Sequence, residues 1–292
     1  MTPDELSDEL DGIAGRAKSA LVRQVAKTNK ALFEQMELLL VKLELASDGT
    51  IKQNQFNRKI LSKVDQYFNS AFANSGYYAN LNILTKVIVD IQDKNALYFN
   101  FILDTFTKDA QYIKSLQRET VRQVESYLAN EGLEAIMKRP IIEIMNQNLN
   151  TGAAYSDLTK QIREFILGSD KLDPTLTRYT RQITTDALFN YSRAFQEAVS
   201  QNAGLQFYIY SGGIIDDSRA FCISHVGKYY HKREIEEMAK QTWAGKRKGT
   251  TASTIFIFAG GYGCLHKWIA VSEKVVPAEV IERAKEKGFY EA

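Results

Sequence analysis

The chain contains few cysteines, histidines and prolines. Its 292 residues include two cysteines, three histidines and four prolines. Two cysteines are too few for the disulfide framework of a small secreted domain. The prolines lie near the starts or ends of segments, so long stretches remain free to form uninterrupted helices. They are Pro3, Pro140, Pro174 and Pro277.

The chain also lacks a large charge excess and a long apolar run. Its 37 basic and 35 acidic side chains give a formal net charge of +2, so the total requires neither a nucleic acid nor an acidic membrane as partner. The apolar runs are far shorter than the roughly 20 residues that a membrane-spanning helix needs. Residues 1–6 are polar and acidic, without a signal-peptide pattern. We therefore expect no membrane partner, and a chain made in the cytoplasm with reduced thiols.

What is present is an ordinary globular composition with an uneven distribution. Hydrophobic residues make up 45% and charged residues 25%, which allows a buried core. Glycine is sparse up to residue 203 and frequent afterwards, and both cysteines and all three histidines lie in this later region. The composition therefore changes near Gly204. We divide the chain into a helical arm or bundle, residues 1–173, and a small α+β domain, residues 174–292.

The first part shows helical periodicity, most clearly over about residues 4–46. Charged and amide side chains fill the faces of this expected helix outside one apolar stripe. The stripe repeats at steps of three and four residues and consists of Leu21, Val25, Thr28, Leu32, Met36, Leu39 and Leu43. A stripe of this length must pack against further helices of this chain or against a neighbouring subunit.

Further helices are expected along the arm and into the second part. They cover about residues 55–72, 84–106, 109–129, 133–148, 156–167 and 174–202. Ser156 is expected to cap the fifth of these, and Asp173 with Pro174 to begin the last. The last also carries a face of mostly small residues that would allow close helix packing. This face consists of Ile183, Ala187, Tyr191, Ala194 and Ala198.

In the second part the pattern changes to short segments. Residues 205–210 are rich in aromatic residues and predict a strand, and residues 254–258 and 267–271 predict two more. Short helices are predicted over about 232–241 and 277–287. The predicted fold class is therefore mostly α, with a long helical N-terminal part and a small α+β C-terminal domain.

Two short cysteine–histidine pairs form the most specific motif. Cys222 precedes His225 by three residues, and Cys264 precedes His266 by two. Thiolate and imidazole are the donors that zinc prefers, and two short pairs on separate loops can supply four tetrahedral ligands. These four residues are the candidate ligands of a structural zinc ion, with His231 left over. The alternatives are a pair of core thiols with partly exposed histidines, and a disulfide between the two cysteines.

A catalytic cysteine is the competing interpretation of the same motif. Cys222 or Cys264 would act as the nucleophile, and His225 or His266 as the base. No Asp or Asn lies beside either histidine to orient it, and no known catalytic signature surrounds either thiol. We therefore predict no catalytic residue. The paired Asp216–Asp217 after a Gly-Gly turn is interpreted as turn and cap chemistry rather than as a metal site.

A basic loop is the candidate contact with nucleic acid. Lys246, Arg247 and Lys248 stand between Gly245 and Gly249, so the three cations are expected on a flexible loop. Mobile basic side chains bind phosphates without sequence preference. The alternative is an ordinary solvated surface loop.

The order of motifs in the second part resembles that of a known family. A helix and an aromatic strand are followed by Asp217-Ser218-Arg219, Cys222, Gly227-Lys228, Gly260-Gly261-Tyr262-Gly263-Cys264-Leu265-His266 and a short strand to Ser272. Over residues 175–273 this order is similar to the C-terminal domain of the phage Mu F-like minor head proteins, the phage head morphogenesis family. The Trp243-x-Gly245 and Thr254–Phe256 segments look like the variant carried by phages of Bacteroidetes-type hosts.

The resemblance implies a structural role in a virion. Family members are minor capsid components tied to the portal, and they assist head assembly and DNA delivery. For this chain it implies the portal protein and other capsid proteins as partners, several copies per particle, contact with packaged DNA, and a place at the portal vertex of a head assembled in the host cytoplasm. The family commonly ends its cluster with His-Pro-x-Cys-Arg-Cys, and here one Cys and the His-Pro are missing. The competing functions are a Cys/His or zinc-dependent hydrolase or transferase of the toxin type, and a DNA-binding adaptor.

Overall fold

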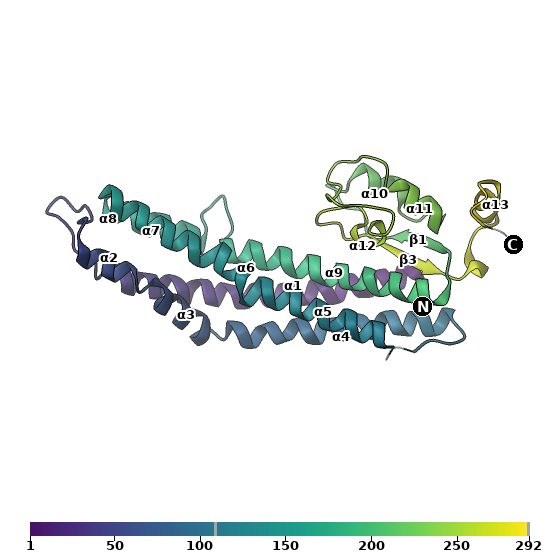
Figure 1. The fold of residues 1–292 in the computed structure, drawn as a ribbon, viewed down its shortest axis with the longest axis horizontal. Coiled ribbons are helices and arrows are strands. Elements are labelled where there is room, and N and C mark those ends of the chain that lie inside the picture. Colours follow the sequence, from purple (N-terminus) through teal and green to yellow (C-terminus); the bar gives the residue numbers. More distant parts are fainter. Residues whose placement is uncertain (108–109, 291–292) are drawn as a thin grey trace. The chain divides into compact units, whose positions relative to one another are not determined.

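The computed structural model describes residues 1–107 and 110–290. Most of these residues are helical, and a small antiparallel sheet lies in the C-terminal part of the chain (Figure 1). The predicted fold class is confirmed. The chain forms two compact units, each assembled from separate segments. Unit 1 comprises Met1–Arg16, Lys86–Thr120 and Thr185–Ala292, and unit 2 comprises Ala17–Thr85 and Val121–Thr184.

Four long helices contribute residues to both units. They are α1 (Pro3–Leu40), α4 (Tyr77–Ile102), α5 (Gln111–Ala129) and α9 (Thr175–Ala203). The units therefore follow spatial contacts, whereas the division of the sequence between residues 173 and 174 follows composition. Asp109, with which the helix corresponding to α5 was expected to begin, lies outside the described residues.

Unit 2 is a helical unit around one apolar core. Besides parts of the long helices it contains α2 (Gln55–Leu61), α3 (Val64–Asn74), α6 (Glu131–Leu133), a π-helical turn (Glu134–Lys138), α7 (Arg139–Thr151) and α8 (Tyr155–Leu167). The apolar stripe predicted on the first helix is buried, and most of it packs in this core together with side chains of α3, α7 and α8. The stripe is therefore covered by other helices of its own chain.

Short backbone bridges set two helix ends that the sequence pattern placed elsewhere. Leu45 pairs with Ile51 in an antiparallel bridge, and α1 ends at Leu40 rather than near residue 46. Thr50 bridges Ala154, which is held in an extended conformation and becomes the N-cap of α8. The prediction of Ser156 as this N-cap was wrong, because the bridge starts the helix earlier.

The helix predicted over residues 55–72 is two helices, α2 and α3. Ser62 closes α2, since its backbone N–H bonds the carbonyls of Arg58 and Ile60. Its hydroxyl donates to the Lys59 carbonyl at 2.9 Å. The hydroxyl and the cap both compete with continuation of the helix, and the chain turns before α3 begins. Apolar periodicity continues across this turn, which is why the sequence pattern did not show it.

Unit 1 contains the sheet. Its strands lie in the order β2 (Tyr229–His231), β1 (Phe207–Ser211), β3 (Lys267–Val271), and all pairs are antiparallel. The sheet is accompanied by α10 (Ala220–His225), α11 (Lys232–Met238), α12 (Ile255–Phe258), a 3₁₀ turn (Glu273–Val275) and α13 (Ala278–Glu286). β1 and β3 confirm the strands predicted over 205–210 and 267–271. β2 was not predicted, because three residues are too few to show a period.

The strand predicted over residues 254–258 was wrong, because this segment forms the short helix α12. Its backbone makes helical hydrogen bonds, from Phe258 N to Thr254 O at 2.8 Å and from Ala259 N to Ile255 O at 2.8 Å. The Thr254 hydroxyl accepts from the backbone N–H of Thr251 at 2.7 Å, which favours a helical turn at this point. Local capping therefore overrides the high strand propensity of Ile and Phe.

The small-residue face predicted on α9 is only partly buried. Of its members only Tyr191 is buried, and the other four are half-buried. The buried side of α9 carries apolar residues such as Leu188 and Phe195, and also polar groups that bond to α4. Gln196 Nε2 donates to Asn95 Oδ1 at 2.7 Å, and Asn95 Nδ2 donates to Ser192 Oγ at 3.4 Å. These buried polar groups of α4 and α9 therefore satisfy one another.

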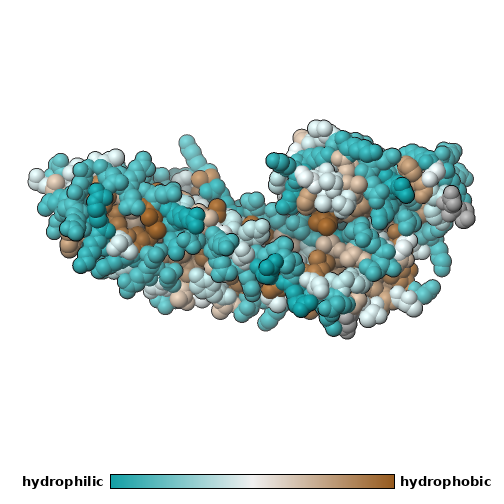
Figure 2. All heavy atoms as spheres, viewed as in Figure 1, coloured by the Kyte–Doolittle hydropathy of each residue, from teal (hydrophilic) through white to brown (hydrophobic). Residues whose placement is uncertain are grey.

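Polar residues cover most of the face seen in Figure 2, and apolar residues form separate patches. The most exposed large apolar side chains are Phe101 and Val41, which are 72% and 70% exposed. Within the described residues, no helix is both long enough and apolar enough to cross a membrane.

Candidate metal centre

Three segments of unit 1 bring the two cysteines of the predicted zinc site together. Cys222 lies in α10, and Cys264 and His266 lie in the loop that leads into β3. Tyr210 of β1 pairs with Trp268 of β3, two residues after His266. Tyr210 therefore lies near this loop. The loop runs close to the chain after β1, where a Cβ on Gly212 would lie 2.9 Å from His266 Cα. Gly212 has a φ of 148°, which also favours glycine there.

Three of the four predicted ligands converge, and they are buried. Cys222 Sγ lies 3.7 Å from Cys264 Sγ, and Cys264 Sγ lies 3.7 Å from His266 Nδ1. The donor atoms of all three residues lie within 4.8 Å of one another. Cys222, Cys264 and His266 are at most 5% exposed. At this sulfur–sulfur distance the two thiols are free rather than joined in a disulfide.

His225, the fourth predicted ligand, does not belong to this group of donor atoms. Its Nδ1 lies 2.6 Å from the Phe221 carbonyl oxygen and 2.9 Å from Ser224 Oγ. These groups belong to its own helix, so the imidazole is bonded along α10. His231 serves as the N-cap of α11, where its Nδ1 accepts from the Arg233 backbone N–H at 3.2 Å.

The Tyr210 hydroxyl is a further polar group beside the sulfurs. It lies 3.5 Å from Cys222 Sγ and 3.6 Å from Cys264 Sγ. The Tyr210 ring also stacks on His266, with centroids 5.4 Å apart and planes 6° from parallel. Sequence reasoning missed Tyr210, because a tyrosine in an aromatic strand has no spacing that links it to either cysteine pair.

Gly260 makes room for the two sulfurs. A Cβ at this position would lie 2.5 Å from Cys222 Sγ and 2.9 Å from Cys264 Sγ. Real Cβ atoms do not approach other heavy atoms this closely, so only glycine fits without a shift. Its carbonyl accepts from Trp243 Nε1 at 2.9 Å, which holds the loop in place.

The two thiols influence each other's protonation. The hydrogen bond between them lowers the pKa of Cys264, burial opposes this effect, and His266 and Arg193 lower the pKa further. The same hydrogen bond, together with burial, raises the pKa of Cys222. The hydrogen bond between the two thiols therefore couples their protonation.

Arg193 of α9 holds the loop that carries Cys264 and His266. Its guanidinium donates to the His266 carbonyl at 2.7 and 3.0 Å, to the Ile257 carbonyl at 3.2 Å, and to the Cys264 carbonyl. The side chain is only 3% exposed. Sequence reasoning missed Arg193, because a single arginine within a helix has no spacing that links it to the loop before β3.

The predicted basic loop is only partly free for nucleic acid. Lys246 Nζ donates to the carbonyls of Ala239 and Gln241 at 2.5 and 2.7 Å, so it caps the region that follows α11. The Arg247 guanidinium lies over the rings of Phe258 and Tyr262, 4.6 and 5.6 Å from their centroids. Lys248 is exposed. Two of the three cations therefore take part in local packing.

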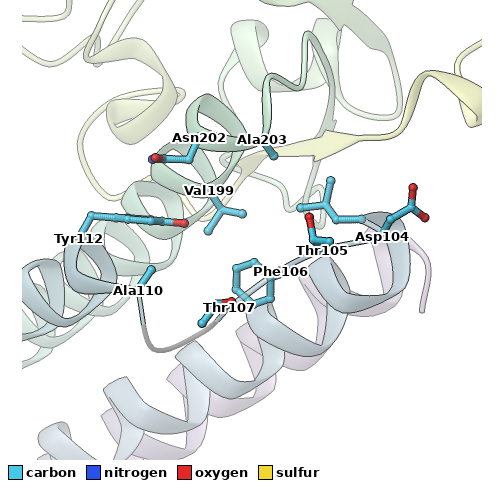
Figure 3. A pocket seen from close by; sticks show the side chains of 10 residues that line it. Asp104, Thr105, Phe106, Thr107, Ala110, Tyr112, Val199, Asn202 and Ala203 are labelled. Atoms are coloured by element: carbon cyan, nitrogen blue, oxygen red, sulfur yellow. The ribbon is translucent and has the colours of Figure 1, made fainter.

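A hollow of about 510 Å³ lies elsewhere in unit 1. Phe106 and Val199 point into it, and Asp104 points away from its centre (Figure 3). Asp104 is the one charged residue among the described residues that line the hollow, and no histidine or cysteine is among them. This lining offers no group of side chains suited to catalysis or metal binding.

Comparison with protein-family models, with curated proteins and with solved structures found no match for this chain.

Proposed function

We propose that this chain is a structural minor capsid protein of a tailed phage, associated with the portal vertex and assisting head assembly and DNA delivery. The proposal rests on the resemblance of residues 175–273 to the phage Mu F-like minor head proteins. The observation that carries it is the meeting in space of motifs that lie about 40 residues apart in the sequence.

The two halves of the resembling motif make direct contacts. The Arg219 guanidinium donates to the Tyr262 carbonyl. Cys222, three residues later, lies against Cys264 with 3.7 Å between the sulfurs. Motifs that are recognised only by their order in the sequence need not be in contact. Parts of one folded module, in contrast, pack against one another. The contacts therefore support the interpretation of these motifs as one module.

The burial of the cysteines favours a structural role over the competing hydrolase or transferase. Cys222 and Cys264 are 2% and 5% exposed. A nucleophilic thiol must reach its substrate, and reactive cysteines lie in partly exposed surroundings. A substrate would reach these sulfurs only after α10 or the loop before β3 had opened.

The proposed partners are the portal protein, other capsid proteins and further copies of the chain. Most of the apolar stripe of α1 packs in the core of unit 2, so partner contacts involve other surfaces of the helical part. Lys248 is the side chain of the basic loop best placed for packaged DNA, because it is exposed and its neighbours Lys246 and Arg247 take part in local contacts.

Mass spectrometry of purified particles tests the proposal. Particles from the phage or prophage that encodes the chain should contain it in several copies. Co-expression with the portal protein encoded alongside should yield a complex of the two, and the portal protein of an unrelated phage is the control. Absence from the particles together with no complex would overturn the proposal. Toxicity of the expressed chain to its host, lost on substitution of Cys264, would favour the toxin-type enzyme.

A further inference from the structure

We propose that Cys222, Cys264 and His266 bind one zinc ion, with the Tyr210 hydroxyl oxygen as the fourth donor. This inference does not depend on the proposed virion role. It replaces His225 of the sequence-based ligand set by a residue of β1.

Four of the six distances between the donors match the edges of a zinc tetrahedron. The four that are defined are 3.5 and 3.6 Å from the Tyr210 oxygen to the sulfurs, 3.7 Å between the sulfurs, and 3.7 Å from Cys264 Sγ to His266 Nδ1. A regular tetrahedron with such edges has its centre about 2.2 Å from each corner, and zinc–ligand distances are about 2.0–2.3 Å. These four distances therefore fit an ion at the centre of such a tetrahedron, and the donor atoms of Cys222 and His266 lie within 4.8 Å of each other.

The imidazole of His266 lacks hydrogen-bond partners of its usual strength. Nδ1 faces a sulfur atom at 3.7 Å, and Nε2 is buried without a hydrogen-bond partner. Coordination through Nδ1 would give this nitrogen a stronger partner than the sulfur and would place the ring proton on Nε2.

The chemistry of the donors selects the metal. Two sulfurs and an imidazole suit zinc, whereas magnesium and calcium prefer carboxylate and carbonyl oxygens. Two thiolates would balance the charge of a divalent ion. All three residues are almost fully buried, so the site is closed, as structural zinc sites are.

The position of the site indicates what the ion would do. It would join α10, β1 and the loop before β3, which come from separate parts of the sequence. The Gly260–Cys264 segment contains no strand or long helix, so its backbone depends on contacts such as those from Arg193 and Trp243. Zinc binding would then contribute directly to the folding stability of unit 1.

Metal analysis of the full chain tests the inference. The protein, purified under reducing conditions and dialysed against zinc and then metal-free buffer, should retain about one zinc per chain. Cobalt added to the chelator-treated protein should produce thiolate-to-metal charge-transfer bands and the intense visible bands of tetrahedral cobalt. Zinc content far below one per chain, or cobalt spectra without thiolate bands, would overturn the site.

Four variants test the donor set. Cys264→Ala and His266→Ala should lose the metal, and Tyr210→Phe should bind it about 10-fold or more weakly. His225→Ala is the matched control and should retain one zinc with unchanged affinity. Loss of zinc in His225→Ala, or unchanged affinity in Tyr210→Phe, would contradict the proposed ligands. Because zinc content and cobalt spectra are measured on the unmodified chain, a variant that fails to fold leaves the main test intact.

Discussion

Glu234 in the first turn of α11 accepts hydrogen bonds from two cationic side chains and one backbone N–H. Arg283 donates to its two oxygens at 2.8 and 3.0 Å, Lys287 donates at 2.9 Å, and the His231 backbone N–H donates at 3.1 Å. Burial alone would raise the pKa of Glu234, but these bonds outweigh it and lower the pKa to about 2. The charged carboxylate is therefore favoured in the folded state.

The lowered pKa of Glu234 predicts a loss of stability in acid. Its contribution is complete above its ordinary pKa of 4.5 and disappears as the pH falls through about 2. Its partners are partly exposed, so solvent screens the interaction and we expect about 1–2 kcal/mol. Denaturant unfolding between pH 7 and pH 2 should show this loss, and Glu234→Gln should remove it. Glu237→Gln on the exposed face of α11 is the control, and an equal effect of the two substitutions would contradict the prediction.

Gly260 and Gly213 form a matched pair of glycines in unit 1. Gly260→Ala should destabilise the protein by about 1–3 kcal/mol, because the added Cβ would press on both sulfurs. Gly213→Ala should be neutral or stabilise by less than about 1 kcal/mol, since nothing lies within 4 Å of its Cβ. Chemical denaturation of the two variants measures the difference. Equal changes in stability for the two variants would contradict the prediction, because they would mean that the atoms around Gly260 move aside to accommodate the added Cβ.

Individual residues also show how far spacing alone can predict a site. The pairs Cys222–His225 and Cys264–His266 have similar spacing, yet only the second histidine joins the sulfurs. In α10 the imidazole of His225 bonds to the carbonyl of the preceding turn, as a helix allows at this spacing. His266 stands in an irregular loop without such a carbonyl partner for its ring. Conformation, not spacing, separates the two.

At the scale of elements, the buried stripe of α1 provides a second matched comparison. Leu32 is fully buried in the core of unit 2, and Leu38 on the same helix is 53% exposed. Leu32→Ala should cost about 2–5 kcal/mol, because it removes buried methyl groups and leaves a cavity. Leu38→Ala should change stability by no more than about 0.5 kcal/mol. Thermal or denaturant unfolding measures the loss of stability in each variant. Similar losses for Leu32→Ala and Leu38→Ala would contradict the burial of this stripe.

The long helices were predicted well because their signal repeats over many turns. The short segment 254–258 was predicted poorly because it contains a single turn. For one turn, a Thr254 hydroxyl bond and a few backbone bonds decide between helix and strand, and a run such as Ile-Phe-Ile-Phe fits both. The ambiguity is physical, since both faces of a short buried segment are apolar in either conformation.

At the scale of the whole molecule, unit 1 depends on segments far from the sheet in sequence. Lys267 of β3 is fully buried, and its ammonium bonds Asp11 of α1 at 2.5 Å. The Tyr98 hydroxyl of α4 donates to the Ala270 carbonyl at 2.7 Å. Loss of Asp11 would leave a buried charge unpaired, which costs about 3–5 kcal/mol. The region 174–292 therefore lacks partners that it needs.

A fragment of residues 174–292 should accordingly fail to fold by itself. We expect a weak near-ultraviolet circular dichroism signal and no cooperative thermal transition. Addition of a fragment of residues 1–173 should restore both, because it supplies Asp11 and Tyr98. A cooperative transition in the isolated 174–292 fragment would contradict this prediction and would support the composition boundary as a folding boundary.

The sequence by itself determined the helical class, the apolar stripe of the first helix, the two strands β1 and β3, and the concentration of cysteine and histidine in one region. These features depend on local periodicity and propensity, which neighbouring residues carry. Only the tertiary structure decided that His266 and Tyr210, rather than His225, lie beside the two sulfurs, and that each unit combines distant segments. Such choices depend on strand register and on which buried groups find partners, and these are set by contacts between residues far apart in the chain.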